Sequence, residues 1–547
     1  MKTIIVGGVA GGASAAVRLR RLCEKDEIVL FEKGDYISYA NCGLPYYISG
    51  VIDKKRALTL QTPKQLMDRF AVDVRVGSEV LSIDTEKKCV AVRELATGRE
   101  YTESYDKMIL APGAVPLVPG FVENKADRRI FVLKDIPDTL RIKDFVTKNE
   151  VKNAVVIGGG FIGLETAENL AEAGVSTKIV ELSDHVLQQV DWDMAQLIEQ
   201  ELRNGGVDVH CSEKVEAVKS GEDKLMVNTD KGSYEADMVV MSLGVRPATG
   251  FAEGAVELNA KGAIVVGDDM RTSNPDIYAA GDAVCVTNAV DGEADYLPLA
   301  GPANKQGRIA ADNIAGIPSK YTGSQGSSIL KVFGKTAART GLSESRAKNY
   351  EKSYTFSKSH AGYYPGATDM WIKVIFDKDT GKLLGAQAFG EDGVDKRMDV
   401  FATAIRLGLS LSQITELELC YAPPYGSAKD PVNMAAYAAE NVYKGLVKIF
   451  HGDRVAELQE RGAYILDVRT AAENRMGRIE GSVNIPLDDL RGRLSELPKD
   501  QPIYVHCAIG LRGYLACRIL SQNGFDCLNL SGGYSLYHQL YGKKQGE

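Results

Sequence analysis

The chain has 547 residues, which is more than one hydrophobic core organises and predicts roughly three or four domains. Its formal charge of −8, from 65 basic and 73 acidic residues, argues against nucleic acid or an anionic membrane surface as the main partner. No apolar run is long enough to span a membrane, and MKTIIVGG enters a strand directly, so we expect a cytoplasmic protein without a signal peptide.

The first glycine-rich segment predicts a dinucleotide-binding fold. Residues 2–6 form a β-branched run that enters GGVAGGASAA, a pattern typical of a buried parallel strand turning into a helix. Gly7 permits the tight turn, and Gly12 permits close packing of the helix, whose N-terminus would face a pyrophosphate. Val9 replaces the middle glycine of the usual fingerprint. Glu32, however, ends the second strand about twenty residues later, where its carboxylate can bind ribose hydroxyls.

Cys42 follows this unit, in the segment NCGLPY. Asn41 precedes it and Pro45 follows, which predicts the start of a helix whose first turn accepts a proline. Free amide groups and the helix dipole at such a position favour a thiolate. Residues 38–47 contain no second cysteine, so a catalytic Cys42 would work alone. A small buried structural cysteine is the alternative.

The nine cysteines show no paired CxxC spacing along the chain. Neither a zinc site nor a disulfide framework is therefore indicated, and we expect no metal. Free thiols suit a reducing compartment.

Two later segments return the chain to the first nucleotide site. Residues 109–113, ILAPG, and residues 276–283, DIYAAGDA, each predict a strand that ends in a turn. The carboxylate of Asp282 could there meet a ribityl hydroxyl or a phosphate. Because the two segments flank an independent module, we expect a discontinuous first domain, residues 1–115 plus 246–322, around an inserted domain, residues 116–245.

The inserted domain carries a full dinucleotide fingerprint. Residues 153–157 lead into GGGFIGLE, a helix is expected as far as Gly174, and the strand TKIVEL follows. Glu181 ends that strand, where a carboxylate accepts a 2′-hydroxyl and repels a 2′-phosphate. No arginine occurs in the following LSDHVL, so NADH is favoured over NADPH. A solvated strand end is the alternative for Glu181.

Two dinucleotide folds, one inserted in the other, resemble the two-dinucleotide-domain flavoprotein disulfide reductases. Within that group, GGVAGGASAA, NCGLPY, GGGFIGLE, AAGDA and LPLAGPANKQGR resemble the coenzyme A disulfide reductases over residues 1–443. The resemblance implies FAD in the first module and NADH in the second. The expected cofactor-binding residues are Gly7, Gly8, Ala10, Gly11, Gly12, Glu32, Asn41, Pro112, Gly113, Gly158, Gly160, Gly163, Glu165, Glu181, Gly281, Asp282 and Ala300.

The third predicted domain spans residues 323–445. Before it, Pro302 lies just inside a helix that, by the resemblance, points its N-terminus at the flavin. Alternating strands followed by a helix then predict an α+β domain, which related enzymes use to form a homodimer. By the same resemblance, Tyr425 would reach from one subunit to Cys42 of the other and donate to a sulfur leaving group, together with Tyr363 or Tyr364. Each tyrosine could instead be a packing residue.

Basic residues mark a candidate coenzyme A site. Arg18, Arg20 and Arg21 end the first predicted helix, and such clusters are usually solvated surface. In the resembling family, however, the coenzyme A phosphates lie near this helix, which implies binding by Arg18, Arg21, Ser38 and Tyr364. The alternative is a pocket for small persulfides.

Residues 450–547 resemble a rhodanese domain, a small α/β fold, in DVR, EGSVNIP, CAIGLRG and SGGY. Cys507 opens the loop CAIGLR, which closes on Arg512. Its successive amides, with Arg512, should cradle a persulfide and lower the thiol pKa. A cysteine phosphatase is the alternative for this loop. His506 is expected to be a packing residue, and Cys517 and Cys527 structural ones.

Together these features predict an α/β enzyme that uses NADH and FAD to reduce persulfides, polysulfides or coenzyme A disulfide through Cys42, while Cys507 carries sulfane sulfur. The direction of sulfur flow between the two cysteines stays open. Two alternatives remain: an NADH oxidase or peroxidase that cycles through a sulfenic acid, and a non-catalytic, redox-sensing sulfur carrier.

Overall fold

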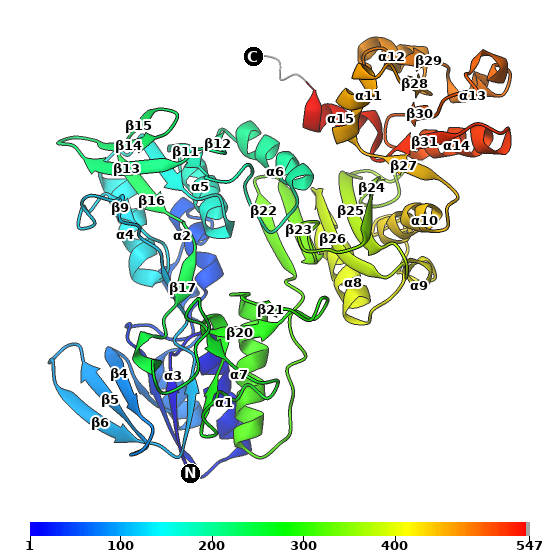
Figure 1. Ribbon diagram of the computed structural model, residues 1–547. Coiled ribbons are helices and arrows are strands. Elements are labelled where there is room, and N and C mark those ends of the chain that lie inside the picture. Colours follow the sequence, from blue (N-terminus) through cyan, green and yellow to red (C-terminus); the bar gives the residue numbers. More distant parts are fainter. Residues whose placement is uncertain (543–547) are drawn as a thin grey trace. The chain divides into compact units, whose positions relative to one another are not determined.

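The computed structural model describes residues 1–542, which form two compact units (Figure 1). Unit 1 comprises Met1–Val186 and Arg203–Gly326, and unit 2 comprises Leu187–Leu202 and the chain from Ser327 onward. Residues 543–547 of the predicted rhodanese domain lie outside the described residues. Among the described residues, no helix is both long and apolar enough to cross a membrane.

Unit 1 contains a five-stranded parallel sheet in the order β19-β7-β1-β2-β3. Its strands are β1 (Lys2–Val6), β2 (Glu27–Phe31), β3 (Asp73–Arg75), β7 (Lys107–Leu110) and β19 (Ile277–Ala279). Helices α1 (Ala10–Leu22) and α7 (Ala300–Ile314) pack together, and a Cβ on Gly307 would lie 2.1 Å from the Gly11 carbonyl oxygen. A three-stranded antiparallel sheet, β4 (Ser78–Asp84), β5 (Cys89–Glu94) and β6 (Glu100–Ser104), precedes β7.

A second parallel sheet in unit 1 has the order β12-β11-β10-β16-β9. Its strands are β9 (Ile130–Phe131), β10 (Asn153–Ile157), β11 (Ser176–Val180), β12 (Asp208–His210) and β16 (Met238–Met241). All of them fall between β7 and β19 in the chain, which confirms that one Rossmann-type fold is inserted in the other. The hairpin sheet of β13 (Val215–Ser220), β14 (Leu225–Thr229) and β15 (Ser233–Ala236) belongs to this insertion.

Unit 2 begins with the antiparallel sheet β22-β23-β26-β25-β24. Its strands are β22 (Ser328–Val332), β23 (Lys335–Gly341), β24 (Tyr350–Lys358), β25 (Asp369–Asp377) and β26 (Leu383–Gly390). Helix α8 (Val394–Arg406) contacts β23 and β26, and α10 (Pro431–Tyr443) contacts β24 and β25. The interior of β25 is buried, as expected of a strand covered on both faces.

The second part of unit 2 has a parallel sheet in the order β27-β31-β30-β28-β29. Its strands are β27 (Lys448–Phe450), β28 (Tyr464–Asp467), β29 (Val483–Asn484), β30 (Ile503–His506) and β31 (Cys527–Leu530). Helices α11 (Val455–Glu460), α12 (Ala471–Met476), α14 (Leu511–Gln522) and α15 (Gly533–Tyr541) alternate with the strands, because parallel neighbours need crossover connections. Cys517 and Cys527 lie in the core of this domain.

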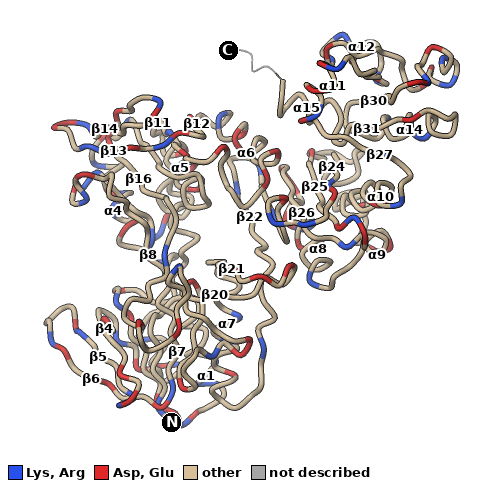
Figure 2. The backbone as a smooth tube through the Cα atoms, in the orientation of Figure 1, with Lys and Arg blue, Asp and Glu red and all other residues tan. Residues whose placement is uncertain are grey.

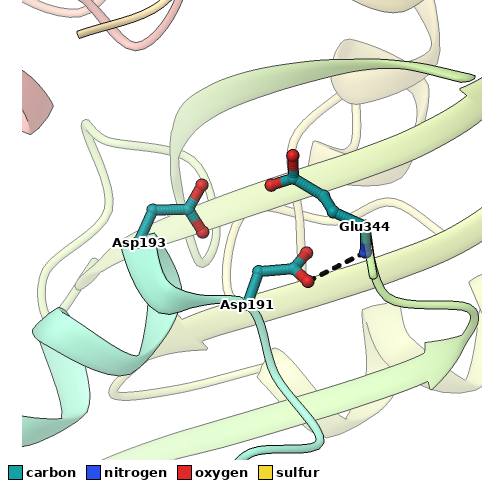
Figure 3. Close-up of side chains that lie close together, drawn as sticks. All are labelled: Asp191, Asp193 and Glu344. Carbon is teal, nitrogen blue, oxygen red and sulfur yellow. Dashed lines mark hydrogen bonds between the residues drawn. The ribbon is translucent and has the colours of Figure 1, made fainter. Parts of the chain in front are cut away.

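Three carboxylates meet within unit 2, those of Asp191, Asp193 and Glu344 (Figure 3). The first two lie at the start of α6 (Trp192–Asn204), and Glu344 follows β23. The fully buried Lys373 of β25 places its Nζ 2.8 Å from both aspartates and also pairs with Glu344. An ammonium group therefore balances the charge of this cluster, and the network fixes the segment Leu187–Leu202 to the sheet of unit 2.

Candidate active site

Two glutamates build cradles of the same design in unit 1. Glu32 follows β2 and accepts hydrogen bonds from the amides of Gly8 and Gly34, both at 2.8 Å. Glu181 follows β11 and accepts from the amides of Gly159, at 2.6 Å, and Ser183, at 2.8 Å. Each carboxylate is thereby held at the carboxyl edge of a parallel sheet, beside the glycine turn, where the ribose of a dinucleotide binds.

The glycines of both turns have the steric roles that the fingerprint requires. A Cβ on Gly12 would lie 1.8 Å from the Gly7 carbonyl oxygen, and one on Gly163 would lie 2.0 Å from that of Gly158. Gly160 precedes α5 (Phe161–Glu172) and has no atom within 4 Å of the position of a Cβ. The helix N-terminus therefore has open space in front of it, which fits a pyrophosphate.

Asp282 lies in the turn after β19, as the sequence predicts. Burial raises the pKa of its carboxyl, and this carboxylate makes no hydrogen bond within the described part of the chain. The Gly281 amide donates to Oε1 of Gln306 at 2.8 Å, which fixes this turn against α7. A partly buried acceptor without a protein donor fits a hydroxyl group of a bound cofactor. Ala300 is the first residue of α7, and Gly113, after β7, has the left-handed φ of +70°.

Cys42 has an exposed side chain and lies in a 3₁₀ turn, Asn41–Gly43, directly before the short helix α2 (Leu44–Ser49). The expectation of a lowered thiol pKa is wrong for the chain as described. Partial burial raises the pKa of Cys42, and the charges of Glu165 and Asp282 raise it further. Both carboxylates come from distant parts of the sequence, so the local pattern around Cys42 gave no sign of them.

Helix α2 is fixed to two helices of the inserted domain. Thr139 of α4 (Ile136–Lys148) donates to the Leu44 carbonyl oxygen at 2.8 Å, and Lys143 donates to that of Tyr47 at 2.6 Å. On α5, Asn169 accepts from the Ser49 hydroxyl at 2.6 Å, and Glu165 accepts from Tyr46 at 3.4 Å. The segment that follows Cys42 is therefore anchored to the predicted nicotinamide domain. Sequence reasoning missed Tyr46.

A cavity of about 310 Å³ lies between α1 and α7. It brings together the predicted residues Arg18, Arg21 and Ser38. Its other lining residues are Ala13, Ser14, Val17, Gln61, Leu66, Asn304 and Arg308. Arg18 pairs with Asp312 at 2.6 Å, so its guanidinium is held in place. The residues of α7 were missed, because some 290 positions separate Ser14 from its hydrogen-bond partner Asn304.

The predicted tyrosines belong to unit 2. Tyr364 and Tyr425 are exposed, and Tyr425 lies in a loop rather than a helix, as its neighbouring prolines predict. Tyr363 and Tyr421 join their hydroxyl groups in a 2.8 Å hydrogen bond. The structure thus gives unit 2 an exposed group of phenols.

Cys507 directly follows β30 and is fully buried within its loop. The Gly510 amide donates to its Sγ at 3.1 Å. From the start of α15, the amides of Tyr534 and Ser535 donate to the carbonyl oxygens of Cys507, at 2.7 Å, and Ala508, at 2.8 Å. These bonds hold loop carbonyl groups away from the sulfur, so that an amide faces it. Such a loop suits an anionic persulfide.

Charged side chains around this loop are paired. Arg512 donates to Glu473 of α12 at 2.6 and 2.8 Å, and these hydrogen bonds lower the pKa of Glu473 to about 2. His506 is fully buried 3.8 Å from Asp467, and burial lowers its pKa to about 4, so it is neutral at pH 7 and fits the packing role predicted for it.

Basic and acidic residues are mixed along the described part of the chain. Lys and Arg alternate with Asp and Glu along the backbone of both units (Figure 2). Extended nucleic-acid sites instead carry basic residues gathered on one face or helix.

Fold and site together define a two-dinucleotide oxidoreductase joined to a rhodanese-like domain. The model of the pyridine nucleotide-disulphide oxidoreductases matches residues 1–307, the model of their dimerisation domain matches residues 328–431, and the rhodanese-like domain matches residues 452–540. The chain belongs to the pyridine nucleotide-disulphide oxidoreductase family. This confirms, at the level of the family, the predicted enzyme class with FAD and NADH as cofactors.

Individual relatives extend the similarity to nearly the whole chain. The coenzyme A disulfide reductase of Staphylococcus aureus (strain COL) is 36% identical over 445 residues, 80% of this chain and 100% of the relative. The reduced CoADR-RHD of Bacillus anthracis is 45% identical, with a TM-score of 0.96 and 98% of each chain covered. An NAD-dependent persulfide reductase from A. fulgidus is 36% identical, with a TM-score of 0.92 over 98% of this chain and 100% of that one.

Proposed function

We propose that this protein is an FAD-dependent, NADH-driven reductase of persulfides, polysulfides and coenzyme A disulfide that works through Cys42. The observation that carries the proposal is one exposed thiol, Cys42, in the turn directly before α2, a short helix that is anchored to α4 and α5. The similarity to the A. fulgidus persulfide reductase over 98% of this chain and to the coenzyme A disulfide reductase of S. aureus over 80% of it supports the choice of substrates.

The cofactors, when bound, supply a hydride and a two-electron carrier to the sulfur site. Glu32 would bind the ribose of FAD, and Asp282 would accept from a further hydroxyl group of it. Glu181 would bind the nicotinamide dinucleotide, and its negative charge favours NADH because it repels a 2′-phosphate.

Cys42, as its thiolate, attacks the sulfur–sulfur bond of the substrate. That bond breaks, one sulfur leaves as a thiol or hydrosulfide, and the other stays on Cys42 as a mixed disulfide or persulfide. No second cysteine occurs within residues 38–47, so the new bond on Cys42 is opened by two electrons rather than by a neighbouring thiol.

The cavity between α1 and α7 would bind coenzyme A through Arg18, Arg21 and Ser38. Two further lining residues, Asn304 and Arg308, offer an amide and a guanidinium to its phosphates. In a homodimer, Tyr364 and Tyr425 of one subunit would complete the site of the other by donating to the leaving sulfur.

Cys507 would carry sulfane sulfur in the rhodanese domain, held by the loop amides with Arg512 at its edge. The corresponding domain boundaries are residues 1–115 plus 246–322 for FAD, 116–245 for NADH, 323–445 for dimerisation and 450–547 for sulfur transfer. Free thiols and small-molecule substrates suit a cytoplasmic enzyme.

The test is anaerobic NADH oxidation by the FAD-loaded protein with coenzyme A persulfide, coenzyme A disulfide or peroxide. The proposal expects sulfide release and the highest kcat/KM with persulfide. Cys42→Ser should abolish this activity, whereas Cys507→Ser, the matched control, should keep it when persulfide is supplied directly. Turnover with peroxide alone would instead identify an NADH peroxidase. Sulfide release by Cys42→Ser would contradict the role of Cys42.

A further inference from the structure

The proposed reaction takes up a proton. Reduction of a persulfide RSSH by NADH gives RSH, H₂S and NAD⁺, and it balances only when one H⁺ is consumed per turnover. The sulfur–sulfur bond breaks and two electrons come from NADH. A sulfur that leaves as an anion is a better leaving group when a nearby acid protonates it. The site therefore needs an acid whose pKa lies near the working pH.

Glu165 has the properties of such an acid. Burial raises the pKa of its carboxyl to about 7, and the neighbouring Glu168 contributes to the rise. The charge of Glu165 also acts on Cys42, because it is the first side chain, after burial, that raises the pKa of that thiol. The two groups are thus coupled electrostatically, although 123 positions separate them in the sequence (165 − 42 = 123).

Tyr46 connects the two groups. Its hydroxyl lies 3.4 Å from Oε1 of Glu165, and residues 41–49 form one continuous helical run. Cys42 lies in the 3₁₀ turn that continues into α2, four positions before Tyr46, and its charge acts on the Tyr46 phenol. A phenol hydroxyl both donates and accepts a hydrogen bond, which lets it pass a proton between a carboxyl group and a sulfur.

We infer that Glu165 and Tyr46 form a proton relay that protonates the sulfur leaving from Cys42. In each turnover the carboxyl O–H bond of Glu165 breaks, Tyr46 passes the proton on, and an S–H bond forms. Solvent then returns a proton to the Glu165 carboxylate. The inference rests on the proposed function, and it gives Glu165 a role besides the cofactor contact expected from the fingerprint.

The charged and titratable groups on the surrounding elements define the pH behaviour. They are Glu168 on α5, Asp138 and Lys143 on α4, Tyr47 on α2, Asp282 in the turn after β19, and Lys134, which acts on Asp282. Lys143 is engaged with the Tyr47 carbonyl oxygen. Asp138 lies in the first turn of α4, and burial raises its pKa to about 6, so it is the group whose titration could most easily be mistaken for that of Glu165.

The first arm of the test needs no substrate. It measures the rate at which iodoacetamide alkylates Cys42 against pH in the FAD-loaded protein, read by mass spectrometry of the Cys42 peptide because Cys420 is also exposed. Glu165→Gln should move the alkylation midpoint to lower pH, since a negative charge beside the thiol is gone. Glu172→Gln, at the exposed end of the same helix, is the control and should leave the midpoint unchanged.

The second arm measures kcat with coenzyme A persulfide against pH. In the wild type, kcat should fall as pH rises through about 7, because Glu165 loses its proton. Glu165→Gln should remove this limb and lower kcat at pH 6 by about 10²–10⁴-fold. Tyr46→Phe should lower kcat and move any remaining limb to higher pH, because the hydrogen bond that lowers the Glu165 pKa is lost. Asp138→Asn should keep the limb.

The outcomes separate the relay from the proposed function. If the wild type reduces persulfide but Glu165→Gln keeps both the alkylation midpoint and the pH limb, the relay is overturned and the function stands. If the wild type reduces no sulfur substrate, the function fails and the relay fails with it. A drop in kcat with an unchanged pH limb would assign Tyr46 and Glu165 a purely structural role in fixing α2.

Discussion

One carboxylate in each half of unit 1 lies where we propose that the ribose of a nucleotide binds. Glu32 and Glu181 occupy equivalent places after the second strand of their sheets, and each is fixed by two backbone amides. These backbone donors orient each carboxylate before any ligand arrives. The two residues are therefore matched controls for one another.

Replacing these glutamates should separate the two cofactors. Glu181→Ala is expected to raise the KM for NADH by roughly 10- to 150-fold, the equivalent of about 1.5–3 kcal/mol for hydrogen bonds to a charged group, with FAD content unchanged. Glu32→Ala should instead lower the FAD retained on purification. Flavin absorbance and steady-state kinetics measure both effects. Equal losses of FAD in the two variants would contradict the assignment of separate cradles.

Sequence was a good guide to these residues and a poor one to the surroundings of Cys42. Glycines and strand-end acids act through local spacing, so Glu32, Glu181 and Asp282 could be located in the printed sequence. The rise in the pKa of Cys42 depends on Glu165 and Asp282, and the cavity near Arg18 depends on Asn304 and Arg308. Such contacts join positions more than a hundred residues apart, which no local pattern encodes.

Strand β25 contains one lysine, Lys373, in an interior that is otherwise apolar. Lys373 is fully buried, and the three carboxylates around it compensate its charge. Burial opposes ionisation of Glu344, but the charges of Lys373 and Lys352 outweigh it and hold the pKa of Glu344 at about 2. A buried ionic network of this kind adds little to the free energy of unfolding compared with an apolar core. Removing one of its members, however, lowers that free energy strongly, because it leaves a buried charge unpaired.

Lys373→Met should therefore destabilise unit 2 by about 3–5 kcal/mol, because it leaves buried carboxylates without a counter-charge. Lys358→Met on the neighbouring β24 is the control: its pair with Asp369 is about half exposed, so a change of at most about 1 kcal/mol is expected. Denaturant unfolding followed by tryptophan fluorescence measures both. Equal effects of the two substitutions would refute the role of the buried network.

The same network predicts how stability responds to acid. The pKa of Glu344 falls from 4.5 to about 2 on folding, so its contribution is fully present above pH 4.5. That contribution is lost as pH falls through about 2, when the folded protein also binds the proton. The difference in unfolding free energy between wild type and Glu344→Gln should shrink across this window, and a constant difference would show that Glu344 is not ionised in the folded state.

At the scale of the whole molecule, two catalytic modules share one chain. The S. aureus relative is covered over its full length by 80% of this chain, and the rhodanese-like domain of this chain accounts for residues 452–540. In unit 2, His451 lies 3.3 Å from Glu351, and the Ser531 hydroxyl accepts from the Tyr354 amide at 3.2 Å. These few polar contacts join the rhodanese domain to β24.

A chain that ends after Leu446 should accordingly keep NADH-driven reduction of coenzyme A disulfide, with kcat within about threefold of the full chain. It should lose sulfur transfer from thiosulfate to a thiol acceptor. Comparing the two activities in both proteins is the measurement. Loss of disulfide reduction in the shortened chain would show that the rhodanese domain is needed for the first reaction.

The segment Leu187–Leu202 also bears on how the protein is made. It leaves the ribosome between two parts of unit 1, yet its partners Glu344 and the fully buried Lys373 are synthesised more than a hundred residues later. The aspartates at its start therefore stay solvated, without their partner lysine, until the sheet of unit 2 has been synthesised. No single cut in the chain yields two complete halves, so a split version for complementation assays would need the segment supplied in place.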